Sequence, residues 1–391
     1  MSHSLFILAG EASGDLHGAA LARALRERQP DIALAGMGGP SMREAGVEVI
    51  HDVTPLAAVG ITEVLGVLRR INAVFNDMVA ELECRRPDAV VLIDYPAFNL
   101  RFARWAHRRG VRVVYYICPQ VWAWHTSRVK LLRRYTHKRL VILPFEPAFY
   151  ARYGVEATFV GHPLIDSLAP YRHSRRFTEE LGLKRDSFIL GILPGSRNNE
   201  IQRLLPAMLG AAERIAAELG NVTLATAPAP SVAPEEYNSW PARTRLPLRL
   251  LPGRTYELMA ASDLLLIASG TATLEAGIIG TPMIVTYKLA PFTAFLAWLL
   301  VRGVRHISLA NLVAGREIVP ELLQRSATPE TIARTALDLI RGGRLPLMAQ
   351  ELAAEVRPRL GPPGAPARAA GEILALLGLG SCASASPAQT S

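Results

Sequence analysis

The chain lacks the segments expected of a membrane-spanning or exported protein. No apolar run approaches the ~18–20 residues that a spanning helix needs. The longest uncharged, strongly apolar stretch covers residues 289–301 and contains Pro291. Residues 1–9 read as a short strand entering a Gly-rich turn, and a signal peptide would need a charged start and a longer apolar core. We therefore expect neither a membrane span nor a signal peptide.

Cysteine and metal-binding patterns are also scarce. The three cysteines (Cys84, Cys118 and Cys382) are widely spaced and form no C-x-x-C pair. An odd number without zinc spacing fits a reducing cytoplasm. The chain has no Asp-x-Asp and no G-x-G-x-x-G dinucleotide fingerprint. We expect no essential metal and no cofactor.

Positive charge is in excess, with a formal net charge of +9. Such a protein suits nucleic acid, an anionic lipid surface or a phosphorylated substrate, and charge alone does not choose among them. Trp122 and Trp124 precede a run of cations within residues 128–139 that we expect on a helix. A solvated helix face and a membrane interface are both open interpretations. Aromatic residues cluster at only two places, so we expect no nucleic acid partner.

The order of apolar runs and turns predicts an α/β protein with two Rossmann-like, doubly wound parallel-sheet domains. A length of 391 residues suits two or three domains. We place one domain at 1–165 and another at 166–345, which opens with a charged linker. Helices at 346–379 and a disordered tail at 380–391 follow. Among the helices we expect are 61–78, 201–219, 319–325 and 329–341.

Acidic residues mark the loops of the first half. Asp94 ends the apolar strand 89–93, and the carboxyl ends of parallel strands border the crevice where such sheets bind ligands. Asp94 is therefore the best-placed general base, and capping the next helix is its alternative role. Glu11 and Asp15 follow the strand 4–9, where two acids would repel a pyrophosphate and better suit a hydroxyl. They and His17 are rival bases, although Asp15 could simply cap a helix.

The stretch 263–287 organises the second half. It reads as strand, turn, short helix and strand, with Ser269, Gly270 and Thr271 in the turn. Open amides at a helix start, together with two hydroxyls, suit an anion. Glu275 sits one turn further on, where a carboxylate reaches a ribose hydroxyl pair. An ordinary capped βα turn is the alternative.

A second loop of this half follows the strand 189–193. Gly195 allows close backbone approach, Ser196 follows it, and Arg197 offers a planar fork for phosphate.

Seven motifs occur in one order along residues 4–345. They are Leu-Ala-Gly-Glu-Ala-Ser-Gly-Asp (8–15), Ile-Asp-Tyr-Pro-Ala-Phe-Asn (93–99), Val-Trp-Ala-Trp (121–124), Gly-His-Pro (161–163), Leu-Pro-Gly-Ser-Arg (193–197), Ser-Gly-Thr-Ala-Thr-Leu-Glu (269–275) and Asn-Leu-Val-Ala-Gly-Arg-Glu (311–317). This set resembles the motifs of the lipid-A-disaccharide synthase family.

The resemblance implies a GT-B glycosyltransferase of lipid A biosynthesis. Its substrates would be UDP-2,3-diacylglucosamine and 2,3-diacylglucosamine 1-phosphate (lipid X), and its products a β-1,6 disaccharide phosphate and UDP. Such enzymes are peripheral on the cytoplasmic face of the inner membrane of Gram-negative bacteria, and their last helices return to the first domain. The phospholipid surface is then a further partner, and the oligomeric state is left open.

The resemblance also assigns roles to individual residues. Asp94 matches the family's base. Arg197 and Asn311 match polar residues important for activity, and we expect both to bind the UDP-sugar. Residues 269–275 match the UDP-binding segment. Two positions depart from the family pattern: Ala97 replaces a frequent second acid, and His125 replaces a frequent Arg.

Apolar residues supply candidate contacts for acyl chains. They precede or begin the helix expected at 61–78 or belong to the Trp motif: Val59, Ile61, Val64, Leu65 and Trp122. The segment 289–301 could serve the same purpose, and a place in the core is the alternative for both regions.

Other functions stay open. A related GT-B enzyme, such as a UDP-N-acetylglucosamine epimerase or an undecaprenyl-linked transferase, has similar loops. A non-enzymatic lipid- or RNA-binding protein would use the basic segment 128–139. A periplasmic-binding-like protein fits poorly with the absence of an export signal.

Overall fold

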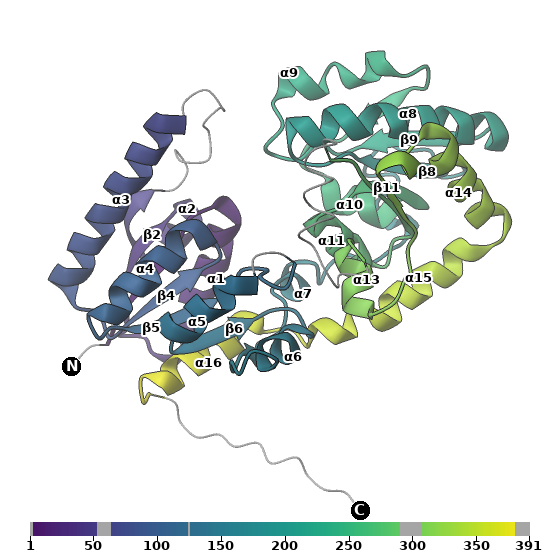
Figure 1. Ribbon diagram of the computed structural model, residues 1–391. Coiled ribbons are helices and arrows are strands. Elements are labelled where there is room, and N and C mark those ends of the chain that lie inside the picture. Colours follow the sequence, from purple (N-terminus) through teal and green to yellow (C-terminus); the bar gives the residue numbers. More distant parts are fainter. Residues whose placement is uncertain (1–2, 53–63, 124–125, 290–305, 380–391) are drawn as a thin grey trace, which may run out of the picture. The chain divides into compact units, whose positions relative to one another are not determined.

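The chain forms two compact units, one of residues Met1–Pro163 with Pro362–Ser391 and one of Leu164–Gly361 (Figure 1). The computed structural model describes residues 3–52, 64–123, 126–289 and 306–379, with side chains described from Arg69 onward in the third helix. The expected pair of doubly wound parallel-sheet domains is confirmed, because every strand pairing in both sheets is parallel. The return of the chain to the first unit, placed at 346 from sequence, lies at 362.

The first unit is built on a seven-stranded sheet of order β3-β2-β1-β4-β5-β6-β7. Its strands are β1 (Ser4–Ala9), β2 (Ala33–Gly38), β3 (Glu48–Asp52), β4 (Ala89–Ile93), β5 (Arg112–Tyr116), β6 (Lys138–Val141) and β7 (Thr158–Phe159). All five residues of β4 are buried, as expected of a strand covered on both faces.

Helices cover both faces of this sheet and enclose two apolar cores. One core includes residues of α1 (Ala12–Arg28), α2 (Pro40–Glu44) and α16 (Ala365–Leu376). The other includes residues of α3 (Val64–Arg85), α4 (Pro96–Arg108), α5 (Val129–Tyr135) and α6 (Glu146–Ala151). Arg368 of α16 donates a 2.8 Å hydrogen bond to the Val160 carbonyl and so fixes the returning helix to the first unit.

The second unit repeats the plan with a six-stranded sheet of order β10-β9-β8-β11-β12-β13. Its strands are β8 (Phe188–Leu193), β9 (Val222–Thr226), β10 (Leu248–Leu250), β11 (Leu264–Ala268), β12 (Met283–Tyr287) and β13 (Glu321–Leu323). Its helices are α7 (Leu164–Ser167), α8 (Asn198–Leu219), α9 (Pro234–Tyr237), α10 (Thr255–Ala261), α11 (Thr271–Ile279), α13 (Leu309–Ala314), α14 (Pro329–Arg341) and α15 (Arg344–Glu355). Residues of α8 and α14 enclose the core on one face of the sheet.

Two predictions of local structure were wrong. The helix expected at 319–325 is strand β13 followed by a 3-10 turn at Gln324–Ser326, and β13 pairs with β12 through Val285 and Glu321. Pairing with β12 at the sheet edge decides the conformation of this segment. The basic run 128–139 is not one helix, since Lys138 and Arg139 lie on β6.

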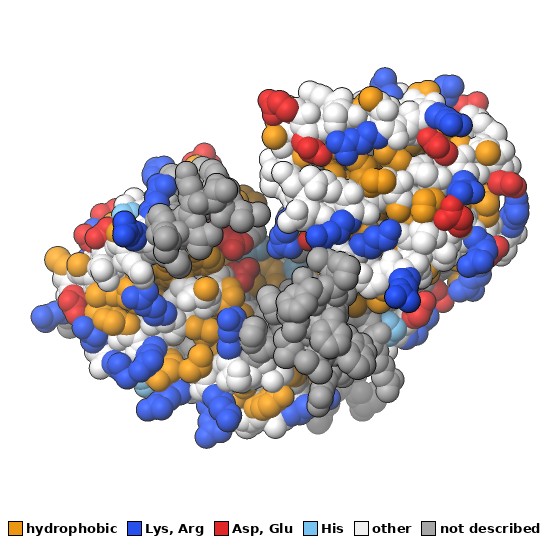
Figure 2. Space-filling view, turned by 45° about the horizontal axis from the view of Figure 1, so that its top comes forward, with side chains coloured by type: hydrophobic (Ala, Val, Ile, Leu, Met, Phe, Trp, Pro, Cys, Tyr) orange, Lys and Arg blue, Asp and Glu red, His pale blue; other side chains and the backbone are white. Residues whose placement is uncertain are grey.

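The described part of the chain contains no helix that is both long and apolar enough to cross a membrane. Figure 2 shows Lys and Arg side chains spread over the visible face of each unit, in keeping with the net charge of +9.

Candidate functional site

Both sheets have the strand order of a Rossmann fold, so each has one point where the order reverses. These points lie between β1 and β4 in the first sheet and between β8 and β11 in the second. Ligands of open α/β sheets bind outside the carboxyl ends of the strands at this switch point. The acids predicted from sequence follow β1 and β4, and the predicted anion loops follow β8 and β11.

Asp94 has an unusual backbone conformation. Asp94 and Tyr95 both have a φ of 46°, the left-handed region that non-glycine residues rarely adopt. Asn99 on α4 donates from Nδ2 to the Asp94 carbonyl at 2.7 Å and to the Ile93 carbonyl at 3.1 Å. The Tyr115 hydroxyl donates to the same Asp94 oxygen at 2.7 Å. Asp94 is therefore fixed by side chains from the next helix and the next strand.

The surroundings of Asp94 favour its role as a base. Burial raises the pKa of Asp94, and the negative charge of Glu11 raises it further. The turn that carries Glu11 packs tightly on the Asp94 loop, because a Cβ on Gly10 would lie 2.1 Å from the ring of Tyr95. A carboxylate with a raised pKa is a stronger proton acceptor at neutral pH.

The rival bases have other environments. Asp15 is buried and accepts backbone N–H bonds from Gly39 (2.7 Å), Ser41 (3.0 Å) and Met42 (2.9 Å). Its carboxylate thus anchors the start of α2 to α1 and has its hydrogen-bonding capacity largely used. Burial lowers the pKa of His17 to about 4, which makes it a weak proton acceptor.

Few of the predicted acyl-chain contacts can be placed. Trp122 is half-buried and packs edge-on against Phe145, with ring centroids 5.0 Å apart. Val64 and Leu65 belong to α3, although their side chains lie outside the described residues. The remaining predictions fall outside the described residues: Val59, Ile61, His125, residues 290–301 and the tail 380–391.

In the second unit the turn after β11 is tied to a segment distant in sequence. The Ser269 hydroxyl donates to the Ile307 carbonyl at 3.0 Å. The Thr273 hydroxyl donates to the Gly270 carbonyl at 2.8 Å and accepts from the Leu309 N–H at 3.2 Å. Thr271 is the first residue of α11 and is exposed. Residues 307–309 thus hold the turn that leads into α11.

Glu275 lies one turn into α11 and is partly buried. Burial raises its pKa, and a hydrogen bond from Tyr256 opposes that rise. The Tyr256 hydroxyl donates to Oε1 of Glu275 at 3.1 Å. This contact orients the Glu275 carboxylate.

The loop after β8 lies at the same switch point. Gly195 has a φ of 115°, and a Cβ there would come within 2.9 Å of Glu200 Oε2, so the position needs glycine. The Ser196 carbonyl accepts a 2.8 Å hydrogen bond from Ser231. The Arg197 side chain is 80% exposed and pairs with Glu200 at 3.0 Å. Its guanidinium is thus accessible to a phosphate.

Asn311 is fully buried and bonded inside the protein. Its Oδ1 accepts from the Ile318 and Val319 N–H groups at 2.8 and 3.1 Å. Its Nδ2 donates to the Val319 carbonyl and to Glu321 Oε1, both at 2.8 Å. The side chain, predicted from sequence to contact the UDP-sugar, is directed into the unit.

The sequence matches the family described as Lipid-A-disaccharide synthetase over residues 5–357. The chain belongs to this family of glycosyltransferases. It is 42% identical over 374 residues to the lipid-A-disaccharide synthase of Myxococcus xanthus, covering 95% of this chain and 97% of that one. It is 43% identical over 335 residues to that of Nitrosococcus oceani, covering 86% of each. The resemblance seen in the seven motifs is confirmed.

Solved structures share the fold of this lipid-A-disaccharide synthase family member. A putative UDP-N-acetylglucosamine 2-epimerase from Listeria monocytogenes aligns with a TM-score of 0.66 at 13% identity, covering 97% of each chain. MurG of Acinetobacter baumannii aligns with a TM-score of 0.57 at 15% identity, covering 97% of this chain and 99% of the other. At these identities the likeness shows the fold, which is the GT-B fold with two Rossmann-like domains.

Sequence reasoning missed several residues that hold the candidate site. Asn99 and Tyr115 hold Asp94, Tyr256 holds Glu275, and Glu321 holds the segment 307–308. Asn99 is the last residue of the motif 93–99, and this motif was the signal by which the sequence could have identified it. Glu321 was not identified because residues 319–325 were predicted to form a helix.

Proposed function

We propose that the chain transfers 2,3-diacylglucosamine from its UDP conjugate to the 6-hydroxyl of lipid X in lipid A biosynthesis. The observation that carries this proposal is the environment of Asp94. A partly buried carboxylate with a raised pKa stands at the switch point of the first sheet, and the charge of Glu11 raises its pKa further. Within a family of lipid-A-disaccharide synthases, that is the group best suited to activate the acceptor hydroxyl.

The reaction is a single displacement at the anomeric carbon. Asp94 takes the proton of the 6-hydroxyl as its oxygen attacks C1 of the donor sugar. The bond between C1 and the β-phosphate oxygen breaks, and UDP leaves with the electron pair. One displacement inverts the configuration, so an α-linked donor gives a β-1,6 product without a covalent enzyme intermediate. Glu11 raises the basicity of Asp94 through its charge.

The second unit binds and stabilises the leaving group. We assign the diphosphate to the backbone amides around Ser269, Gly270 and Thr271 at the start of α11. Gly195 and Ser196 supply a close backbone approach, and the exposed guanidinium of Arg197 supplies positive charge. Glu275, oriented by Tyr256, accepts the ribose hydroxyls.

Acyl chains of both substrates require an apolar surface. We assign Val59, Ile61, Val64, Leu65 and Trp122 to contacts with these chains. Each buried methylene contributes ~0.8 kcal/mol, so a few such side chains hold a lipid substrate. The exposed cations Lys130, Arg133 and Arg134 of α5 would attract anionic phospholipids at the cytoplasmic face of the inner membrane.

The test is incubation of the purified chain with UDP-2,3-diacylglucosamine and lipid X, followed by mass spectrometry. The proposal predicts equal amounts of UDP and disaccharide 1-phosphate, formed only when both substrates are present. UDP-N-acetylglucosamine, which lacks acyl chains, serves as the control donor and should give no disaccharide. Conversion of a UDP-sugar without acceptor would instead indicate an epimerase.

A further inference from the structure

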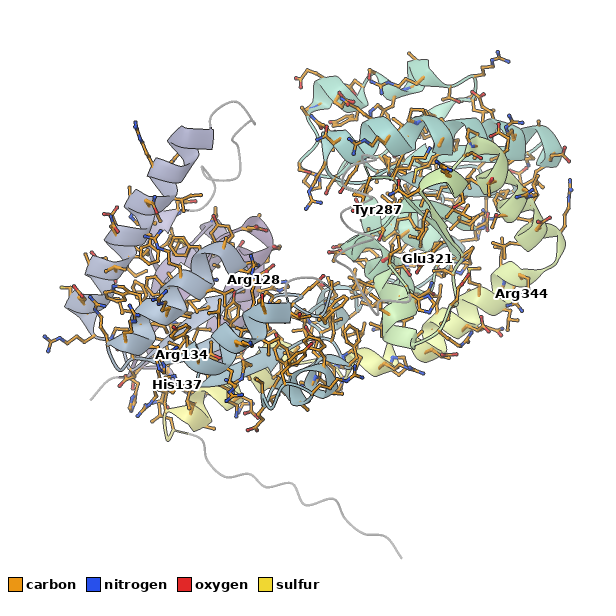
Figure 3. All side chains as sticks on the ribbon, viewed as in Figure 1. Arg128, Arg134, His137, Tyr287, Glu321 and Arg344 are labelled. Atoms are coloured by element: carbon orange, nitrogen blue, oxygen red, sulfur yellow. The ribbon has the colours of Figure 1, made fainter. Side chains whose placement is uncertain are left out.

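The carboxylate of Glu321 connects three parts of the second unit. Oε2 accepts from the Ile307 N–H at 2.9 Å, and Oε1 accepts from the Ser308 N–H at 3.0 Å and from Asn311 Nδ2 at 2.8 Å. Glu321 begins β13, the last strand of the sheet, and Figure 3 labels it within the second unit. Among the residues that the structure describes, no Lys or Arg forms an ion pair with it. The carboxylate oxygens of Glu321 accept hydrogen bonds from N–H donors.

The residues held by Glu321 in turn hold the turn after β11. Ile307 accepts from the Ser269 hydroxyl through its carbonyl, while Glu321 accepts from its N–H. Leu309 donates to the Thr273 hydroxyl, which is bonded to the Gly270 carbonyl. The start of α11 is therefore connected to the sheet edge through segment 307–309 and the carboxylate of Glu321.

Asn311 completes this arrangement from the inside. It fixes Glu321 through Nδ2, and it holds residues 318 and 319, just before β13, through Oδ1. Its backbone N–H donates to the Ser308 hydroxyl at 3.2 Å. A direct contact between the Asn311 side chain and a ligand would break one of these buried hydrogen bonds, which is costly.

We propose that Glu321 is a positioning residue of the UDP site, and that Asn311 supports UDP binding through Glu321 instead of touching the ligand. This inference rests on the proposed use of the 269–271 turn for the diphosphate. Loss of the Glu321 carboxylate frees the 307–308 amides, removes the support of Ser269 and loosens the backbone amides aimed at the leaving group. Preorganised donors lose their effect when their backbone is free to move.

The first test is Glu321→Gln, which keeps the size of the side chain and replaces one accepting oxygen by an NH2 group. Glu213→Gln is the matched control, since Glu213 also accepts a backbone N–H (Arg245, 2.7 Å) and a hydroxyl (Thr244, 2.9 Å) in the same unit. We expect UDP to bind roughly tenfold more weakly to Glu321→Gln, the cost of about one buried hydrogen bond. The KM for the donor should rise more than kcat falls, and the control should bind UDP as the wild type does.

The second test exchanges the partners. Asn311→Asp places a carboxylate against the Glu321 carboxylate, and adding Glu321→Gln restores a donor–acceptor pair of reversed polarity. We expect the double variant to bind UDP more tightly than Asn311→Asp alone. If the two substitutions weaken UDP binding additively, the proposed coupling between Asn311 and Glu321 is overturned.

Hydrogen exchange measured without ligand distinguishes a failure of the positioning role of Glu321 from a failure of the proposed function. In Glu321→Gln the amides of 306–309 and 269–273 should exchange faster than in Glu213→Gln. Unchanged exchange overturns the positioning role whatever the activity. Faster exchange with unchanged UDP affinity overturns its connection to the UDP site. A wild-type chain that binds no UDP overturns the proposed function itself, before any variant is compared.

Discussion

The side-chain amide of Asn99 donates a 2.7 Å hydrogen bond to the backbone carbonyl of Asp94. The Tyr115 hydroxyl donates to the same oxygen at 2.7 Å. Left-handed backbone at a non-glycine residue costs on the order of 1–3 kcal/mol, and Asp94 and Tyr95 both adopt it. The two donors offset this cost and hold the backbone that carries the Asp94 side chain.

Tyr115→Phe should therefore reduce turnover. The ring stays in the core while the hydroxyl that holds the Asp94 carbonyl is lost. We expect kcat to fall roughly tenfold, equivalent to ~1.4 kcal/mol, with UDP affinity unchanged. Steady-state kinetics and calorimetry measure the two quantities. Tyr135→Phe, the same substitution at another buried tyrosine of the first unit, is the control. Equal kcat values for the two variants would contradict a role of the Tyr115 hydroxyl in holding Asp94.

Glu11→Gln should shift the pH dependence of the reaction. The negative charge of Glu11 raises the pKa of Asp94, so its removal lowers that pKa. Because the base must be deprotonated, the acid limb of kcat/KM should move to lower pH. Glu27→Gln, at the far end of α1, the helix that Glu11 precedes, should leave the limb in place, because Glu27 is exposed. If the acid limb of Glu11→Gln stays at the wild-type pH, the charge of Glu11 does not set the pKa of the base.

Tyr256→Phe should weaken UDP binding through Glu275. The hydroxyl donates to the Glu275 carboxylate at 3.1 Å, and its loss leaves a partly buried carboxylate without this donor and raises its pKa further. We expect UDP to bind roughly threefold to tenfold more weakly. The affinity for 2′,3′-dideoxy-UDP, which lacks the ribose hydroxyls, should change less. Tyr237→Phe in the same unit is the control, and an equal loss for both ligands would argue against a ribose contact.

Glu146 should make stability depend on pH. Burial raises the pKa of Glu146 from 4.5 to about 7, although the Leu143 and Ile142 N–H groups oppose the rise. Between these values the folded state binds more protons than the unfolded state, so stability falls as pH rises from 4.5 to about 7. Glu146→Gln removes this loss. The free energy of unfolding of the variant minus that of the wild type should therefore increase by on the order of 3 kcal/mol from pH 4.5 to pH 8. Urea unfolding at both pH values measures it; a constant difference would show that Glu146 does not titrate in this range.

Much of the fold follows from short-range patterns in the sequence. Continuous apolar runs such as 89–93 and 264–268 predict buried parallel strands, and the residues after them must lie at the carboxyl edge of a sheet. Asp94 and Ser269 were found in this way. These are properties of single segments, which do not require knowledge of the rest of the chain.

Contacts between distant segments could not be predicted. Strand β13 has three residues and exists through its pairing with β12, so its sequence alone did not exclude a helix. From sequence, Asp15 was a rival base or helix cap and Asn311 a candidate for UDP-sugar binding, and the structure shows both buried and hydrogen-bonded to backbone groups. Tertiary packing decides whether a polar residue faces a ligand or holds a loop.

In the proposed reaction the first unit supplies the base and the second unit binds UDP. Asp94→Asn tests it most directly, by measuring kcat for disaccharide formation and the Kd for UDP on the same preparation. We expect kcat to fall by about 10²–10⁴-fold, typical of the loss of a general base, with an unchanged Kd. Wild-type turnover by a folded Asp94→Asn protein would contradict it.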